Sequence, residues 1–138
     1  MIRVVIVVVV VVVAFAVALL AQRRAPHPPA RSGGERPDQL DRADFAHPDA
    51  PWLIAAFTSA TCDVCIDTWQ KVRVLESAEV AVQQIDYPRD RALHERYAID
   101  AVPLVLVVDE HGVVHDSFVG PVSATHLWAA VAAARGSS

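Results

Sequence analysis

Apolar and polar residues alternate in blocks through the second half of the chain. A continuous apolar run at residues 52–59 predicts a strand buried on both faces, and residues 80–87 predict a second strand. Between them, residues 62–77 place apolar side chains at helical spacing. Residues 104–120 contain two apolar runs joined by Asp-Glu-His-Gly, which indicates a β-hairpin.

Three further segments complete the predicted order. Residues 41–46 predict a short edge strand, residues 89–99 a charged helix, and residues 123–136 a helix that opens with a serine cap. The order β-β-α-β-α-β-β-α predicts an α/β fold, with a mixed sheet flanked by helices.

The N-terminal segment has a different pattern. Val4–Ala21 contains no charged or polar side chain, and a helix of this length reaches across a hydrocarbon core of about 30 Å. We therefore predict one transmembrane helix within residues 1–21. The alternative is a cleaved signal peptide, because AFA and AVA resemble cleavage sites; the apolar run exceeds a signal core of about 7–15 residues, which favours a retained anchor.

Arginine is distributed unevenly around this segment. One arginine precedes it, whereas four follow it within the next fifteen residues: Arg23, Arg24, Arg31 and Arg36. Positive flanks favour the cytoplasmic side, so we expect a single-pass membrane protein whose folded domain faces the cytoplasm, with an extracytoplasmic domain as the alternative.

The composition of the remaining chain indicates a linker followed by one folded domain. Residues 22–46 are rich in proline and arginine and predict a linker, which includes the edge strand noted above. Residues 47–138 are sufficient for one domain of about ninety residues. The net charge of −4 and the absence of a basic stripe argue against nucleic-acid binding. Gly33-Gly34 lies in the linker, outside any strand–loop–helix context, so we expect no phosphate-binding loop.

The only two cysteines, Cys62 and Cys65, lie where the first buried strand turns into a helix. They could be a reactive pair, metal ligands or two core residues. A zinc site would need two more ligands, such as His111 and His115, but six extended residues (104–109) carry these histidines roughly 20 Å away. A helix N-terminus stabilises a thiolate, which favours the reactive pair.

Several motifs together resemble the thioredoxin family across residues 52–135, in a membrane-tethered form of bacterial type. They are the strand followed by TCDVC, the segment YAIDAVP before the hairpin, and SFVGPVSATHLWAAV at the end. The resemblance implies a thioredoxin-like fold. It also implies a cis Val102–Pro103 bond and packing of Pro103 against the cysteine pair.

The resemblance also implies roles for individual residues. Cys62 would be the attacking thiolate and Cys65 the resolving thiol of a redox-active disulfide, with no metal and no organic cofactor. The partners would be protein thiols and disulfides, the carrier that recycles the pair would be unknown, and the chain would be a monomer. The residues expected to contact the substrate are Thr61, Asp63, Val64, Val102 and Pro103.

The chain also departs from the thioredoxin pattern. The buried acid of thioredoxin, six residues before the first cysteine, falls on Ala56, and its lysine partner falls on Val82. Asp63 and Val64 are unusual between the cysteines. These departures support an alternative, a thioredoxin-fold module that binds a membrane partner without turnover. We interpret His94 and the acidic segment 86–90 as solvated surface.

Overall fold

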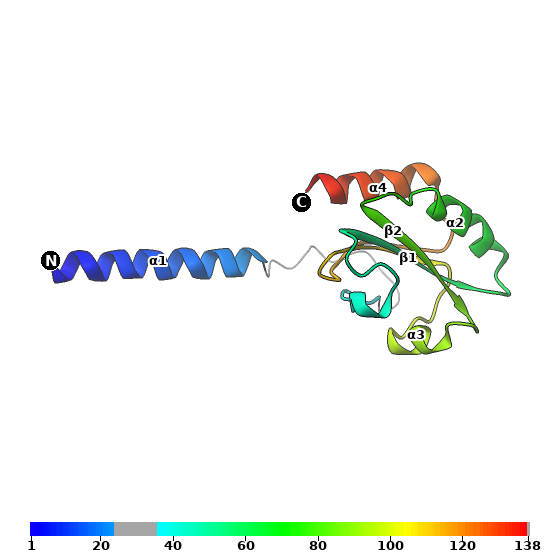
Figure 1. Cartoon of the computed structure of the whole chain (residues 1–138), viewed down its shortest axis with the longest axis horizontal. Coiled ribbons are helices and arrows are strands. Elements are labelled where there is room, and N and C mark those ends of the chain that lie inside the picture. The colour runs from blue at the N-terminus through cyan, green and yellow to red at the C-terminus, as the bar shows by residue number, and fades with distance from the viewer. Residues whose placement is uncertain (24–35, 138) are drawn as a thin grey trace. The chain divides into compact units, whose positions relative to one another are not determined.

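The computed structural model describes residues 1–23 and 36–137, with side chains in the N-terminal helix described as far as Val17. The chain separates into two units, residues 1–33 and 34–138. The first unit contains one helix, α1 (Ile2–Arg23), and the second contains a sheet with its covering helices (Figure 1).

The predicted transmembrane helix is the main error of the sequence interpretation. Within the described part of the chain, no helix has the length and apolar character needed to cross a bilayer. The predicted localisation as a single-pass membrane protein is therefore wrong.

The sheet has four strands in the order β2-β1-β3-β4. The central strand β1 pairs parallel with β2 and antiparallel with β3, and β3 pairs antiparallel with β4. The sheet is therefore mixed, as the sequence predicts. The strands are β1 (Trp52–Ser59), β2 (Val80–Tyr87), β3 (Leu104–Asp109) and β4 (Val114–Val119).

Helices cover both faces of this sheet. Figure 1 shows α2 (Asp63–Arg73) and α4 (Ala124–Gly136) on one side and α3 (Arg91–Arg96) on the other. As predicted, Ser123 caps α4 by accepting a hydrogen bond from the His126 backbone N–H.

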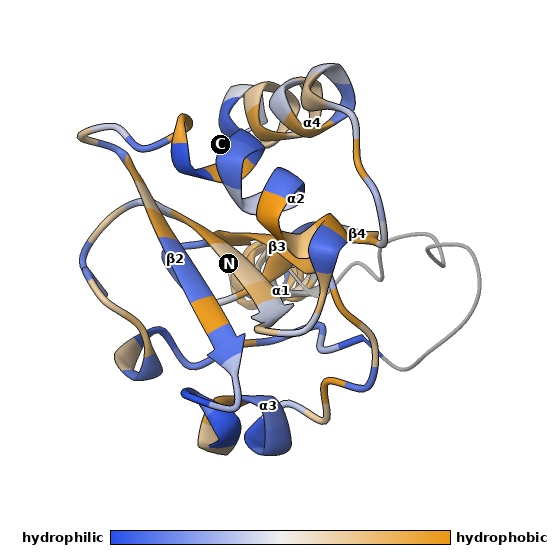
Figure 2. Cartoon of the chain, turned by 90° about the vertical axis from the view of Figure 1, so that its right-hand side faces the viewer, coloured by the Kyte–Doolittle hydropathy of each residue, from blue (hydrophilic) through white to orange (hydrophobic). Residues whose placement is uncertain are grey.

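The alternating side chains of β1 supply the cores of both faces. Trp52, Ile54 and Ala56 pack on the α2/α4 side, together with Val72 and Leu127. The intervening residues of β1 pack on the α3 side. In Figure 2, β2 changes from hydrophobic to largely hydrophilic along its length, so the polar residues of this strand gather near its carboxyl end.

The segment before β1 differs from its prediction. Residues 41–46 form no strand; a 3₁₀ helix, η1 (Arg42–Asp44), occupies this place because the Asp41 carboxylate accepts a hydrogen bond from the Ala43 N–H and starts a turn. The strand-like pairing in this part of the chain lies before residue 41, where Gln39 forms a single antiparallel β-bridge with Val113. Of the predicted linker, residues 24–35 lie outside the described residues.

Residues 38–45, which we call the N-terminal strap, pack on the domain. Leu40 and Phe45 are buried in the α3-side core. The Leu40 N–H donates to the Gly112 carbonyl at 2.8 Å, and the Val114 N–H donates to the Asp38 carbonyl at 3.0 Å. The strap is therefore attached to the β3–β4 turn.

Gly112 is required at this attachment for two reasons. Its φ is +80°, and a Cβ on it would lie 1.9 Å from the Leu40 carbonyl oxygen. Gly120 has a similar φ of +78°, but a Cβ there meets no atom within 4 Å. The two glycines share the backbone requirement and differ in the close contact.

We expect Gly112→Ala to lower the free energy of unfolding by about 3 kcal/mol or more, because the strap must move away from the turn. Gly120→Ala should cost only about 1 kcal/mol, from the left-handed backbone alone. Urea unfolding of both variants measures the difference. Equal losses for the two variants would show that the strap contact contributes little.

Candidate functional site

Cys62 occupies the N-cap of α2, just beyond the carboxyl end of β1. Its backbone N–H donates to the Ser59 carbonyl at 3.1 Å, which closes the turn from strand to helix. Its Sγ accepts a hydrogen bond from the Cys65 N–H at 3.2 Å. The sulfur therefore lies at the positive end of a helix, where a thiolate is stabilised.

The two cysteines form a disulfide, with their Cα atoms 5.3 Å apart. The pairing expected from the resemblance is therefore present. Cys62 is partly exposed, whereas Cys65 is only 2% exposed and faces the sheet. A partner molecule has access to one sulfur, and the other is protected beneath the helix.

The start of β3 lies at the same edge of the sheet. Leu104 pairs with Phe57 of β1, so Pro103 lies one step further, at the level of Thr58. The Val102–Pro103 bond is cis, which confirms the expectation from the resemblance. Pro103 is buried and Val102 is partly exposed; direct packing of Pro103 on the cysteines stays a prediction.

The other residues expected at a substrate surface lie on the outer side of the turn. Val64 is 41% exposed, and Thr61 and Asp63 are at least partly exposed as well. The fold therefore brings the five predicted contact residues to one edge of the domain, although their role in binding stays a prediction.

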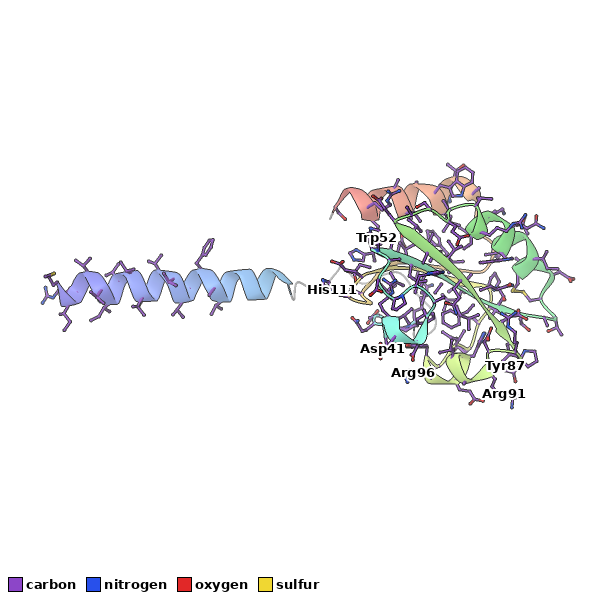
Figure 3. All side chains as sticks on the ribbon, in the orientation of Figure 1. Asp41, Trp52, Tyr87, Arg91, Arg96 and His111 are labelled. Carbon is purple, nitrogen blue, oxygen red and sulfur yellow. A yellow bond between two sulfur atoms is a disulfide. The ribbon has the colours of Figure 1, made fainter. Side chains whose placement is uncertain are left out.

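Tyr87 and Arg91 also reach this edge and were not predicted. The Tyr87 carbonyl accepts a hydrogen bond from the Ala60 N–H at 2.9 Å, two residues before Cys62. The Arg91 guanidinium lies 5.3 Å from the centre of the Tyr87 ring and donates to its hydroxyl at 2.7 Å. Figure 3 shows the two side chains together at this end of the domain.

A buried polar cluster lies on the sheet face that α2 covers. The Thr58 hydroxyl, on a fully buried residue, donates to the Asp86 carboxylate at 2.6 Å. The Gln84 amide donates to the Thr58 hydroxyl oxygen at 3.1 Å. Asp86 is thus a hydrogen-bonded, partly buried group, and its interpretation as solvated surface is wrong. Ala56, at the position of the thioredoxin acid, is fully buried and apolar.

His94 likewise is not a solvated residue. It is 6% exposed, its Nε2 lies 2.9 Å from the Ile85 carbonyl oxygen, and its ring packs edge-on against Phe57 at 5.3 Å. The amphipathic pattern of the short helix α3 is too brief to reveal which side faces the sheet. His94 therefore holds α3 against β2.

The Asp90 carboxylate supports the loop beyond β2. Hydrogen bonds from Arg89, followed by the Asp86 backbone N–H, lower the pKa of its carboxyl although burial opposes this. Asp90 and Arg89 also form a partly exposed ion pair at 2.8 Å. These contacts fix the turn that carries Tyr87.

The histidines considered as zinc ligands lie at the other end of the sheet. Trp52 pairs with Asp109, so the β3–β4 turn with His111 is at the amino end of β1 (Figure 3). His115 Nε2 lies 2.8 Å from Asp109 Oδ2. Burial alone would raise the pKa of Asp109, but hydrogen bonds from His115 and two backbone N–H groups hold it below its ordinary value. Within residues 1–23 and 36–137, no three His, Cys, Asp or Glu side chains are grouped to hold a metal.

The same end has an open hollow of about 520 Å³, lined partly by Asp41, Arg96, Tyr97 and His111. Arg96 in this lining contacts Asp44 at 2.8 Å and Asp41 at 3.6 Å. The cysteines lie at the opposite sheet edge. The hollow therefore plays no part in the candidate site.

Comparison with known proteins gives matches in structure only. No family model matches the chain, and no curated protein is similar to it in sequence. A mutant thioredoxin from Halobacterium salinarum aligns with a TM-score of 0.58 and 24% identity, over 73% of this chain and 95% of that one. Fasciola hepatica thioredoxin gives 0.53 and 22%, over 61% and 81%. Spinach chloroplast thioredoxin F gives 0.52 and 20%, over 62% and 78%.

These similarities establish the thioredoxin-like fold, an α/β mixed sheet with flanking helices. At such low sequence identity they show the fold of this chain and do not show its activity. They give no support to a bacterial origin or to membrane attachment, both of which the sequence interpretation included.

The unequal exposure of the cysteines predicts unequal reactivity after reduction. In a short pulse of iodoacetamide at neutral pH, we expect Cys62 to be alkylated at least about tenfold faster than Cys65. Fragment-ion mass spectrometry of the peptide that contains both cysteines measures this ratio. Cys65→Ser should retain the fast reaction and Cys62→Ser should lose it; similar rates in the two variants would contradict the prediction.

Proposed function

We propose that the domain is a thiol–disulfide oxidoreductase that acts on protein disulfides through Cys62 and Cys65. The observation that carries the proposal is the disulfide between a partly exposed sulfur at a helix N-cap and a buried sulfur one turn later. The thioredoxin-like fold and the cis Val102–Pro103 bond at the same sheet edge support it.

The proposed reduction proceeds by two thiol–disulfide exchanges. The Cys62 thiolate attacks one sulfur of the substrate disulfide, which forms a mixed disulfide and releases one substrate thiolate that takes up a proton. The Cys65 sulfur, after losing its proton, attacks Cys62 Sγ and releases the second substrate thiol. Two electrons have moved to the substrate, and the Cys62–Cys65 disulfide has formed.

Neighbouring groups influence the first exchange in opposite directions. The N-terminus of α2 and the Cys65 N–H favour a negative charge on Cys62 Sγ. Asp63, in the first turn of α2, carries a negative charge that opposes it. We propose that the substrate chain contacts a surface formed by Thr61, Val64, Val102 and Pro103. We also propose that a separate dithiol or disulfide carrier returns the cysteine pair to its starting redox state.

A second candidate is a binding module of thioredoxin-like fold that performs no turnover. It is favoured by Ala56 and by the partly buried Val82, since these positions provide neither the acid nor the lysine of thioredoxin. Under this alternative, the loss of the Cys62 thiol would leave partner binding intact.

We expect Cys65→Ser to accumulate mixed disulfides with protein substrates, because the second exchange is blocked while the first remains. Non-reducing electrophoresis with and without a later reductant detects these adducts.

With insulin as the substrate and dithiothreitol as the electron source, the unmodified chain should accelerate reduction at least about tenfold over Cys62→Ser.

The matched control is Cys62→Ser, which retains a buried thiol but lacks the exposed one. It should form no adducts and should not accelerate insulin reduction. If the unmodified chain is equally inactive while it still exchanges with dithiothreitol, the oxidoreductase proposal fails and the binding module becomes the better account.

A further inference from the structure

Thr68, in the middle of α2, has a buried hydroxyl without a hydrogen-bond partner. The residue is 0% exposed, and its Oγ1 finds no donor or acceptor among the described residues. A buried hydroxyl without a partner costs free energy, so such groups are rare and call for an explanation.

Thr68 lies one helical turn after the buried cysteine. Cys65, Thr68 and Val72 form the buried stripe of α2, and residues three apart on a helix are neighbours. Helical side chains tilt towards the N-terminus, so the Thr68 side chain leans over the turn that contains Cys65.

Buried side chains on the same sheet face are apolar or already hydrogen-bonded. Val72 and Ala56 of the same core cluster are apolar. The Thr58 hydroxyl on this sheet face already donates to Asp86 and accepts from Gln84. On the buried stripe of α2, the sulfur of Cys65 is the side-chain atom within one turn of Thr68 that can form a hydrogen bond.

The hydrogen-bonding capacity of that sulfur changes with its redox state. In the disulfide, Cys65 Sγ is bonded to Cys62 Sγ and is a weak acceptor. Reduction gives this sulfur an S–H group that can donate, and the loss of that proton for the second exchange gives a thiolate, which is a strong acceptor. We infer that Thr68 is a positioning residue for the resolving sulfur, with a hydroxyl that is unpartnered in the disulfide and hydrogen-bonded to Cys65 Sγ when the pair is reduced.

The inference rests on the proposed dithiol chemistry and deepens it. A dithiol reductant breaks the Cys62–Cys65 bond by two exchanges and transfers two electrons and two protons, while its own sulfurs join in a disulfide. Thr68 keeps its proton throughout. Its contribution is to stabilise the reduced form and to hold Cys65 in place for the second exchange.

The test is the redox equilibrium of the full chain with mixtures of reduced and oxidised dithiothreitol. Thr68→Val removes the hydroxyl and keeps a side chain of the same shape. The oxidised form is then free of the cost of an unpartnered hydroxyl, whereas the reduced form loses a hydrogen bond. We expect the equilibrium constant for reduction to fall about tenfold, equivalent to a potential about 30 mV more negative. Thr68→Ser, which keeps the hydroxyl, should stay within about twofold of the unmodified chain.

A matched control separates this role from ordinary packing. Val131→Thr places a hydroxyl on a buried residue of the same core cluster, on α4. It should destabilise the oxidised and reduced forms alike in urea unfolding and leave the equilibrium with dithiothreitol unchanged. Thr68→Val should instead stabilise the oxidised form relative to the reduced form by the same factor as the shift in equilibrium.

If Thr68→Val does not fold, Thr68→Ala removes the same hydroxyl and replaces it in the test. An equilibrium within about twofold of the unmodified chain for the hydroxyl-free variant would overturn the inference. This outcome is separate from a failure of the proposed function, because dithiothreitol equilibration needs no protein substrate. A tenfold shift without insulin reduction would support the role of Thr68 and reject the oxidoreductase.

Discussion

The central strand β1 is held between a parallel neighbour and an antiparallel neighbour, and its residues from Trp52 to Thr58 are all buried. Because side chains alternate along a strand, a slip of one residue would exchange the two cores and move Thr58 away from Asp86. The register also determines where the chain leaves the sheet. Cys62 reaches the start of α2, and Pro103 reaches the same edge, because both follow from the pairing of β1.

Much of the fold could be predicted because it depends on local patterns. The strands at 52–59 and 80–87 have the predicted bounds, since each is an apolar-rich run with turn residues beyond it. Asp-Glu-His-Gly predicts the hairpin, and Gly112 has the positive φ that such a turn needs. The segment 41–46 differs from its prediction because a side-chain cap on Asp41 competes with extended backbone, and a short alternating pattern cannot decide between them.

The candidate site could also be predicted only in part: its contiguous motifs could be recognised, and its contacts between distant residues could not. The cysteine pair and the cis bond before Pro103 could be predicted from motifs that are contiguous in the chain. Thr58 and Asp86 are 28 residues apart, and only the register of two strands makes them partners. His94 was missed for a related reason: in α3 a polar residue on the buried side has the same composition signal as one on the surface. Apolar composition misled in the opposite direction at α1, where no helix of the described residues can span a bilayer.

The N-terminal strap gives the domain an unusual boundary. Leu40 and Phe45 belong to the α3-side core, together with Leu53, Leu106 and Val108, although they precede the first strand. A fragment that begins at Trp52 would leave that core open to water on a sheet that is rich in valine and leucine. Exposed apolar sheet surface of this kind promotes self-association. The strap therefore covers apolar surface of the sheet, and we expect a domain that begins before Asp38 to self-associate less than one that begins at Trp52.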